Sequence, residues 1–153
     1  MRSKKLKYKP NIVIPPVIEE KMEKYRQIKH GTESGGVLLG KILEDNTIIV
    51  CDCSKPCISG KASYAGFYRS ANKANKIIEQ AFIDSGGRLI YVGEWHTHPE
   101  DSPTPSYVDK HSLEDIYNSV KNFYPDVLVY IIIGKKSNYY GYYDGVLHHN
   151  IFE

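Results

Sequence analysis

The chain has 153 residues, of which 41% are hydrophobic and 25% charged, which is typical of one globular domain and unlike a disordered chain. No run reaches the ~18 apolar residues of a membrane-spanning helix, so we predict a cytoplasmic protein without a membrane segment. The net charge is only +2, and no basic body or DNA-binding motif is present, so nucleic acid is not an expected partner.

The first ten residues form a basic segment that contains Arg2, four lysines and no acidic residue. The rest of the chain is therefore net negative. A basic end can contact nucleic acid or a membrane surface, but a solvated, frayed terminus is the simpler interpretation. We predict a basic tail over residues 1–10 and one domain over residues 11–153.

Helices and strands are expected to alternate along the first half. Residues 11–14 predict a short strand, and a helix opened by two prolines follows, to about residue 28. Residues 33–44 and 47–53 predict two antiparallel strands joined by a turn at Asp45-Asn46.

The second half continues the alternation. The expected elements are a helix over residues 71–85 closed by Gly86-Gly87, a strand over 88–95, a helix over 107–120, a buried strand over 126–134, and a hairpin over 138–151 that turns at Asp144-Gly145. This order predicts a single α/β domain with a curved, mixed central sheet flanked by helices.

The segment GEWHTHPEDSPTPSYVD carries a candidate metal site. His96 and His98 are two residues apart at the end of a strand, so their side chains point to the same face. Asp109 follows on the first turn of the next helix. Two imidazoles and a carboxylate leave one coordination position open, as a catalytic zinc site does. We therefore predict one Zn²⁺ per chain.

Hydrolysis at such a site also needs a base that does not bind the metal. Glu33 is the candidate, because it opens the segment ESGGVLLG, whose two glycines allow close backbone approach. Ser106 is the candidate for stabilising the developing oxyanion. Ser106 is equally well placed as the N-cap of the helix that follows it.

The pattern of Glu33, His96-Thr97-His98, seven residues, Ser106, two residues and Asp109 resembles the JAMM motif of MPN-domain metalloproteases. The stretch GEWHTHPEDSPTPS is similar to the bacterial JAB branch of that family. The resemblance implies an MPN/JAB fold, which is cytidine-deaminase-like. It also implies zinc binding by the two histidines and Asp109, with Glu33 as general base and Ser106 steadying the tetrahedral intermediate.

The resemblance further implies hydrolysis of peptide or isopeptide bonds after the C-terminal glycine of a ubiquitin-like protein. Similar bacterial proteins accompany activating-like and conjugating-like enzymes, including those of anti-phage systems of the CBASS type. The implied partners are thus ubiquitin-like conjugates or tails and those enzymes. The chain is too short for the long insertions by which eukaryotic deubiquitinases of the family grip ubiquitin chains.

Two other functions stay open at this point. The first is a non-catalytic MPN scaffold that binds partner proteins; the complete set of ligand residues argues against it. The second is a metallo-amidohydrolase acting on small amino-acid conjugates, which a panel of substrates would separate from an isopeptidase.

Several residues outside the motif have two interpretations each. A second metal site is one interpretation of three cysteines, and ordinary strand and loop positions are the other: Cys51, Cys53 and Cys57. Trp95 is expected in the core, facing away from His96. Six other residues either contact the cleft or the substrate, or take ordinary surface or packing positions: His30, Tyr64, Phe67, Tyr68, Glu100 and Asp101. His111, His148 and His149 are expected on solvated faces.

Overall fold

The computed structural model describes residues 9–26, 33–57, 71–121 and 127–152, so most of the predicted basic tail lies outside it. The elements in chain order are β1 (Ile12–Val13), α1 (Pro16–Glu23), β2 (Gly35–Ile42), β3 (Ile48–Cys53), α2 (Ala71–Asp84), β4 (Ile90–Thr97), α3 (Tyr107–Val120), β5 (Leu128–Ile133), β6 (Asn138–Tyr143) and β7 (Leu147–His148). The strands form one mixed sheet in the order β1-β3-β2-β4-β5-β6-β7. The predicted α/β class with a mixed central sheet is confirmed.

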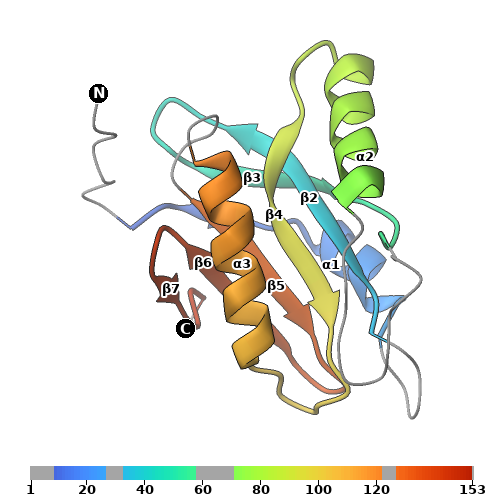
Figure 1. The fold of residues 1–153 in the computed structure, drawn as a ribbon, viewed down its shortest axis with the longest axis vertical. Helices are drawn as coiled ribbons and strands as arrows, with labels where there is room; N and C mark the ends of the chain where they lie inside the picture. The colour runs from blue at the N-terminus through green and yellow to red at the C-terminus, as the bar shows by residue number, and fades with distance from the viewer. Residues whose placement is uncertain (1–8, 27–32, 58–70, 122–126, 153) are drawn as a thin grey trace.

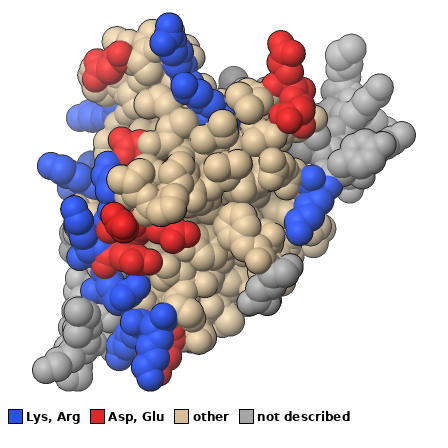
Figure 2. Space-filling model, turned by 180° about the vertical axis from the view of Figure 1, so that it is seen from behind, with Lys and Arg blue, Asp and Glu red and all other residues tan. Residues whose placement is uncertain are grey.

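The sheet is covered by helices on both faces (Figure 1). On one face, buried side chains of the sheet pack against α2 and α3, as Ala74 and Leu113 show. On the other face they pack against Ile18 and Met22 of α1. Figure 2 shows the molecule from this α1 side, where Lys, Arg, Asp and Glu lie mainly around the edges and the middle is uncharged. No helix in the described ranges is long and apolar enough to cross a membrane.

The parallel neighbours β4 and β5 are joined by a crossover that contains α3. Gly93 pairs with Val129 and Thr97 with Ile133. A parallel pair needs such a crossover, and in α/β folds the strand ends that lead into it commonly form binding sites. All six residues of β5 are buried, as its continuous apolar run predicts. The carboxyl end of β4 thus lies near the start of α3.

The antiparallel strands β2 and β4 approach very closely at the end of β4. Gly35 pairs with His96, and a Cβ on Gly35 would lie 2.5 Å from the Trp95 carbonyl oxygen and 2.6 Å from His96 Cβ. Only glycine fits here without displacing the histidine. The predicted close approach is therefore present at Gly35, and it places the residue that precedes β2 beside the end of β4.

Strand β4 contains a β-bulge. Leu38 pairs with Gly93 but Leu39 with Tyr91, so Val92 is an extra residue. As a result Tyr91 packs on the α2/α3 side, whereas Val92 and Trp95 pack on the α1 side. Trp95 is 1% exposed and, as predicted, belongs to the core on the side away from His96.

Three expected boundaries need correction. Helix α1 ends at Glu23 rather than near residue 28, because Tyr25 and Arg26 bond to carbonyls three residues back in tight turns. Strand β2 begins at Gly35, after Glu33. Strand β4 continues to Thr97 rather than ending at Trp95, because Thr97 N–H donates to the Ser34 carbonyl at 2.8 Å.

The predicted hairpin near the C-terminus is confirmed. Strands β6 and β7 pair antiparallel, and the turn at Asp144-Gly145 uses a φ of 106° at Gly145, a backbone conformation that favours glycine. The hairpin adds the last two strands of the sheet beside β5.

Candidate metal centre

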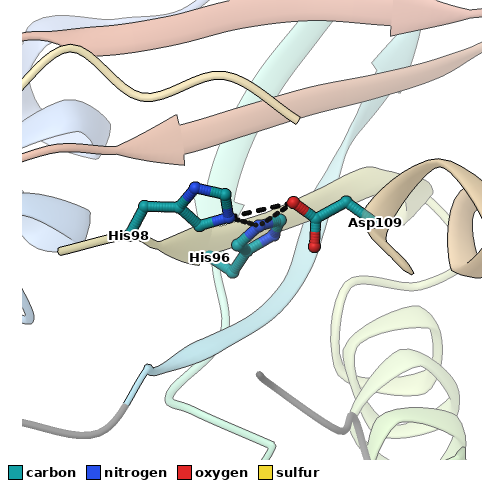
Figure 3. Close-up of side chains that lie close together, drawn as sticks. All are labelled: His96, His98 and Asp109. Atoms are coloured by element: carbon teal, nitrogen blue, oxygen red, sulfur yellow. Dashed lines mark hydrogen bonds and ion pairs between the residues drawn. The ribbon is translucent and has the colours of Figure 1, made fainter. Parts of the chain in front are cut away.

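His96 and His98 on and just after β4, and Asp109 on the first turn of α3, converge on one point (Figure 3). Their ligand atoms all lie within 4.8 Å of one another. The two Nε2 atoms are 2.9 Å apart, and Asp109 Oδ2 lies 2.9 Å from His98 Nε2 and 3.4 Å from His96 Nε2. All three side chains point inward to a common position, as the strand alternation and the helix start predict.

The protonation of His96 and Asp109 suits a metal. Burial lowers the pKa of His96, which favours the neutral imidazole that a metal requires. Burial alone would raise the pKa of Asp109, but hydrogen bonds with His96 and His98 hold it well below its usual range, so the carboxylate is ionised. For His98, burial alone would lower the pKa, but hydrogen bonds with Asp109 and Glu100 raise it, so a metal would have to displace a proton from this ring. Zinc bonds of about 2.0–2.1 Å place tetrahedral ligand atoms roughly 3.3 Å apart. The observed separations and the donor set therefore fit Zn²⁺.

Ser106 and Asp109 form a capping box at the start of α3. Asp109 N–H donates to Ser106 Oγ at 3.1 Å, and Ser106 N–H donates to Asp109 Oδ2 at 2.8 Å. The predicted N-cap role of Ser106 is confirmed. The same carboxylate oxygen thus faces the histidines and caps the helix, so the local fold of α3 orients the third ligand.

Two variants separate the capping role of Ser106 from a role in the reaction. Glycine is nearly as good an N-cap as serine, whereas alanine costs about 1 kcal/mol. We expect Ser106→Ala to lower the thermal midpoint and Ser106→Gly to leave it almost unchanged, while both lose about 10-fold or more in kcat. Thermal unfolding and steady-state kinetics check this, and an active Ser106→Gly would reduce Ser106 to a cap.

Glu33 lies beside the histidines although it is not part of β2. The pairing of β2 with β4 continues past Gly35, because Ser34 N–H donates to Thr97 Oγ1 at 2.9 Å. Glu33 is 5% exposed. Burial raises its pKa to about 7, with His98 opposing and Asp109 adding to the rise. A carboxyl group with this pKa can both take and release a proton near neutral pH.

Two further side chains contact the site, and their contacts with the histidines were not identified from the sequence. Glu100 is exposed, as the favoured interpretation of an acidic loop expected, but its Oε1 also lies 2.8 Å from His98 Nδ1. Its spacing of two residues from His98 is the only sequence signal for this contact. Tyr130 is the one polar side chain in the apolar strand β5, and its hydroxyl lies 3.3 Å from His96 Nε2. Burial raises the pKa of Tyr130 well above its usual value, so the hydroxyl stays protonated.

The cysteines do not form a second site in the part of the chain that the structure describes, where the histidines with Asp109 are the one candidate metal cluster. Cys53 packs in the core on the α1 side and Cys57 in the core on the α2/α3 side, so the sheet separates them. None of the three cysteines forms a disulfide among the described residues.

The other histidines and aromatic residues lie as follows. His111 is exposed against the edge of Tyr107, and His149 is exposed with Nδ1 2.8 Å from the Tyr139 hydroxyl. His148 is half-buried and stacks on Tyr142. The expected solvated positions are thus confirmed for two of the three. His30, Tyr64, Phe67 and Tyr68 lie outside the described residues.

Comparisons with known proteins find relatives that match most of the chain. A CD-NTase/cGAS isopeptidase of Vibrio cholerae is 34% identical over 85% of this chain and 80% of its own length. One of Escherichia coli is 30% identical over 86% and 81%. A probable metalloprotease of Sinorhizobium fredii is 30% identical over 84% and 79%. A solution structure of a protein from Desulfitobacterium hafniense has the same fold, with a TM-score of 0.59 and 16% identity, covering 91% of this chain and 89% of the other.

A family model described as prokaryotic homologs of the JAB domain matches residues 15–142. The match includes Glu33, Ser106 and the three candidate ligands, and it extends over most of the chain. The chain therefore belongs to the family of prokaryotic JAB-domain proteins.

Proposed function

We propose that this chain is a zinc-dependent isopeptidase that hydrolyses the amide bond after the C-terminal glycine of a ubiquitin-like or similarly conjugated protein. The observation that carries the proposal is the convergence of two histidines and Asp109 within 4.8 Å, next to the buried carboxyl group of Glu33. The names of the relatives support an isopeptidase acting on conjugates of a CD-NTase-type enzyme.

The reaction divides between the metal and five residues of the chain. Zinc at such a site supplies Lewis acidity, which polarises the amide carbonyl and acidifies water. Glu33 takes a proton from the attacking water and passes it to the leaving amine as the C–N bond breaks. The Ser106 hydroxyl donates to the carbonyl oxygen as negative charge develops on it. Asp109 and the two histidines would hold the metal.

A panel of three substrate types tests the proposal. The panel contains a ubiquitin-like protein joined to a reporter by a lysine isopeptide bond, the same protein joined by a linear peptide bond, and an amide of a single amino acid. We expect zinc-dependent cleavage of the first two and none of the third. Cleavage of the amino-acid amide alone would indicate a small-molecule amidohydrolase, and zinc binding without any cleavage would indicate a scaffold.

A further inference from the structure

We propose that Glu100 is a positioning residue that holds His98 in the tautomer and orientation of a metal ligand. His98 lies between two carboxylates: its Nδ1 is 2.8 Å from Glu100 Oε1, and its Nε2 is 2.9 Å from Asp109 Oδ2. A carboxylate only accepts hydrogen bonds. Glu100 therefore keeps a hydrogen on Nδ1, so when Nε2 and Asp109 share a metal ion the lone pair of the ring would be on Nε2, facing the point shared with His96.

The backbone around Glu100 is fixed by the turn between β5 and β6. Lys135 N–H donates to the Glu100 carbonyl at 2.7 Å, and Ser137 N–H donates to the Asp101 carbonyl at 2.9 Å. Pro103 packs so tightly against Gly134 that a Cβ there would lie 2.4 Å from the proline Cδ. The loop from β4 to α3 is thus attached to the sheet, so the backbone of Glu100, from which its carboxylate extends toward His98, has a fixed position.

The Glu100 side chain is 49% exposed. Ion pairs between exposed side chains contribute only about 0–1 kcal/mol to stability, so exposure alone would make this contact a weak one. Its partner is different, because the His98 side chain is only 6% exposed. A ring with one nitrogen facing a metal position is oriented by what its other nitrogen contacts, and losing such a contact typically weakens metal binding about 10–100-fold. The proposal rests on the metal site of the proposed function.

The test compares zinc affinity in four proteins: the wild type, Glu100→Ala, Glu100→Gln and Asp101→Asn. The last is the matched control, because it removes a negative charge from the adjacent residue, whose carboxylate contacts Lys136 rather than His98. Competition with a chelator of known affinity gives the dissociation constants. Nitrogen-15 NMR of the histidine rings, with and without zinc, shows which nitrogen of His98 carries the hydrogen.

We expect zinc binding to weaken about 10–100-fold in Glu100→Ala. The loss should be smaller in Glu100→Gln, because its amide oxygen still accepts a hydrogen bond from Nδ1. In Asp101→Asn the loss should be less than about threefold. In the metal-free protein, at a pH where the ring is neutral, His98 should carry its hydrogen on Nδ1 in the wild type and become a mixture of tautomers in Glu100→Ala. Equal losses in Glu100→Ala and Asp101→Asn, or wild-type affinity in Glu100→Ala, would overturn the positioning role alone. A wild type that takes up no zinc would overturn the proposed function as well.

Discussion

Replacing Glu33 by glutamine is expected to lower kcat by about 10²–10⁴-fold while zinc stays bound at about one per chain. Glutamine has the shape of glutamate but cannot take a proton from water, and Glu33 is not part of the candidate ligand cluster. Kinetics on the isopeptide substrate and metal analysis of the same preparation measure both quantities. Glu44→Gln is the matched control, since this glutamate lies exposed beyond the other end of β2.

The same variant has a stability effect whose sign follows from burial. The pKa of Glu33 is raised from 4.5 to about 7 on folding, so the folded state holds this proton more tightly than the unfolded state. The metal-free wild type therefore loses stability as pH rises between these values. At pH 8, metal-free Glu33→Gln should be more stable by about 1–3 kcal/mol, and the gain should shrink toward pH 4.5. Loss of zinc from Glu33→Gln, or full activity, would make the base assignment wrong.

Replacing Asp109 by asparagine is expected to weaken zinc binding by at least about 100-fold. The ionised carboxylate supplies the negative charge among the three ligands, and a neutral amide does not replace it. Asparagine keeps an oxygen that can accept from Ser106 N–H, so α3 should remain capped. Asp109→Ala removes both functions and should cost about 1 kcal/mol more in the metal-free protein.

Zinc competition and thermal unfolding with and without zinc separate these two effects of Asp109. The matched control is Asp115→Asn, an exposed aspartate on the same helix, which should bind zinc like the wild type. Added zinc should raise the midpoint of the wild type and of Asp115→Asn, but not of Asp109→Asn. If Asp109→Asn binds zinc as the wild type does, Asp109 is not a ligand.

Much of the site could be predicted from residue types and from spacings between residues that are near one another in the sequence. His96 and His98 share a strand face, and Ser106 caps α3 because a short polar side chain precedes a helical run. The buried strand β5 and the turn at Gly145 follow from an apolar run and from a glycine at a tight turn. Such features depend on period and local sterics, which a sequence displays directly.

Features that depend on contacts across the fold were not predictable in this way. Glu100 contacts His98 only because the turn between β5 and β6 fixes its loop, and Tyr130 reaches His96 only because β5 lies beside β4. The location of Glu33 beside the histidines was inferred by resemblance, since over sixty residues separate them. The bulge at Val92 interrupts a strand whose composition gives no sign of it.

The extra residue at Val92 makes the side of the sheet on which the histidines lie depend on the bulge in β4. Side chains alternate with a period of two, so an unbulged strand that kept Tyr91 on its present side would turn His96 to the opposite one. Loss of the bulge with Val92 retained would therefore exchange the surroundings of Trp95 and His96, whereas deletion of Val92 together with the bulge would leave both side chains on their present sides. Relatives should therefore keep the five-residue spacing from Tyr91 to His96 together with the bulge, and any relative that is one residue shorter here should have a regular strand without the bulge.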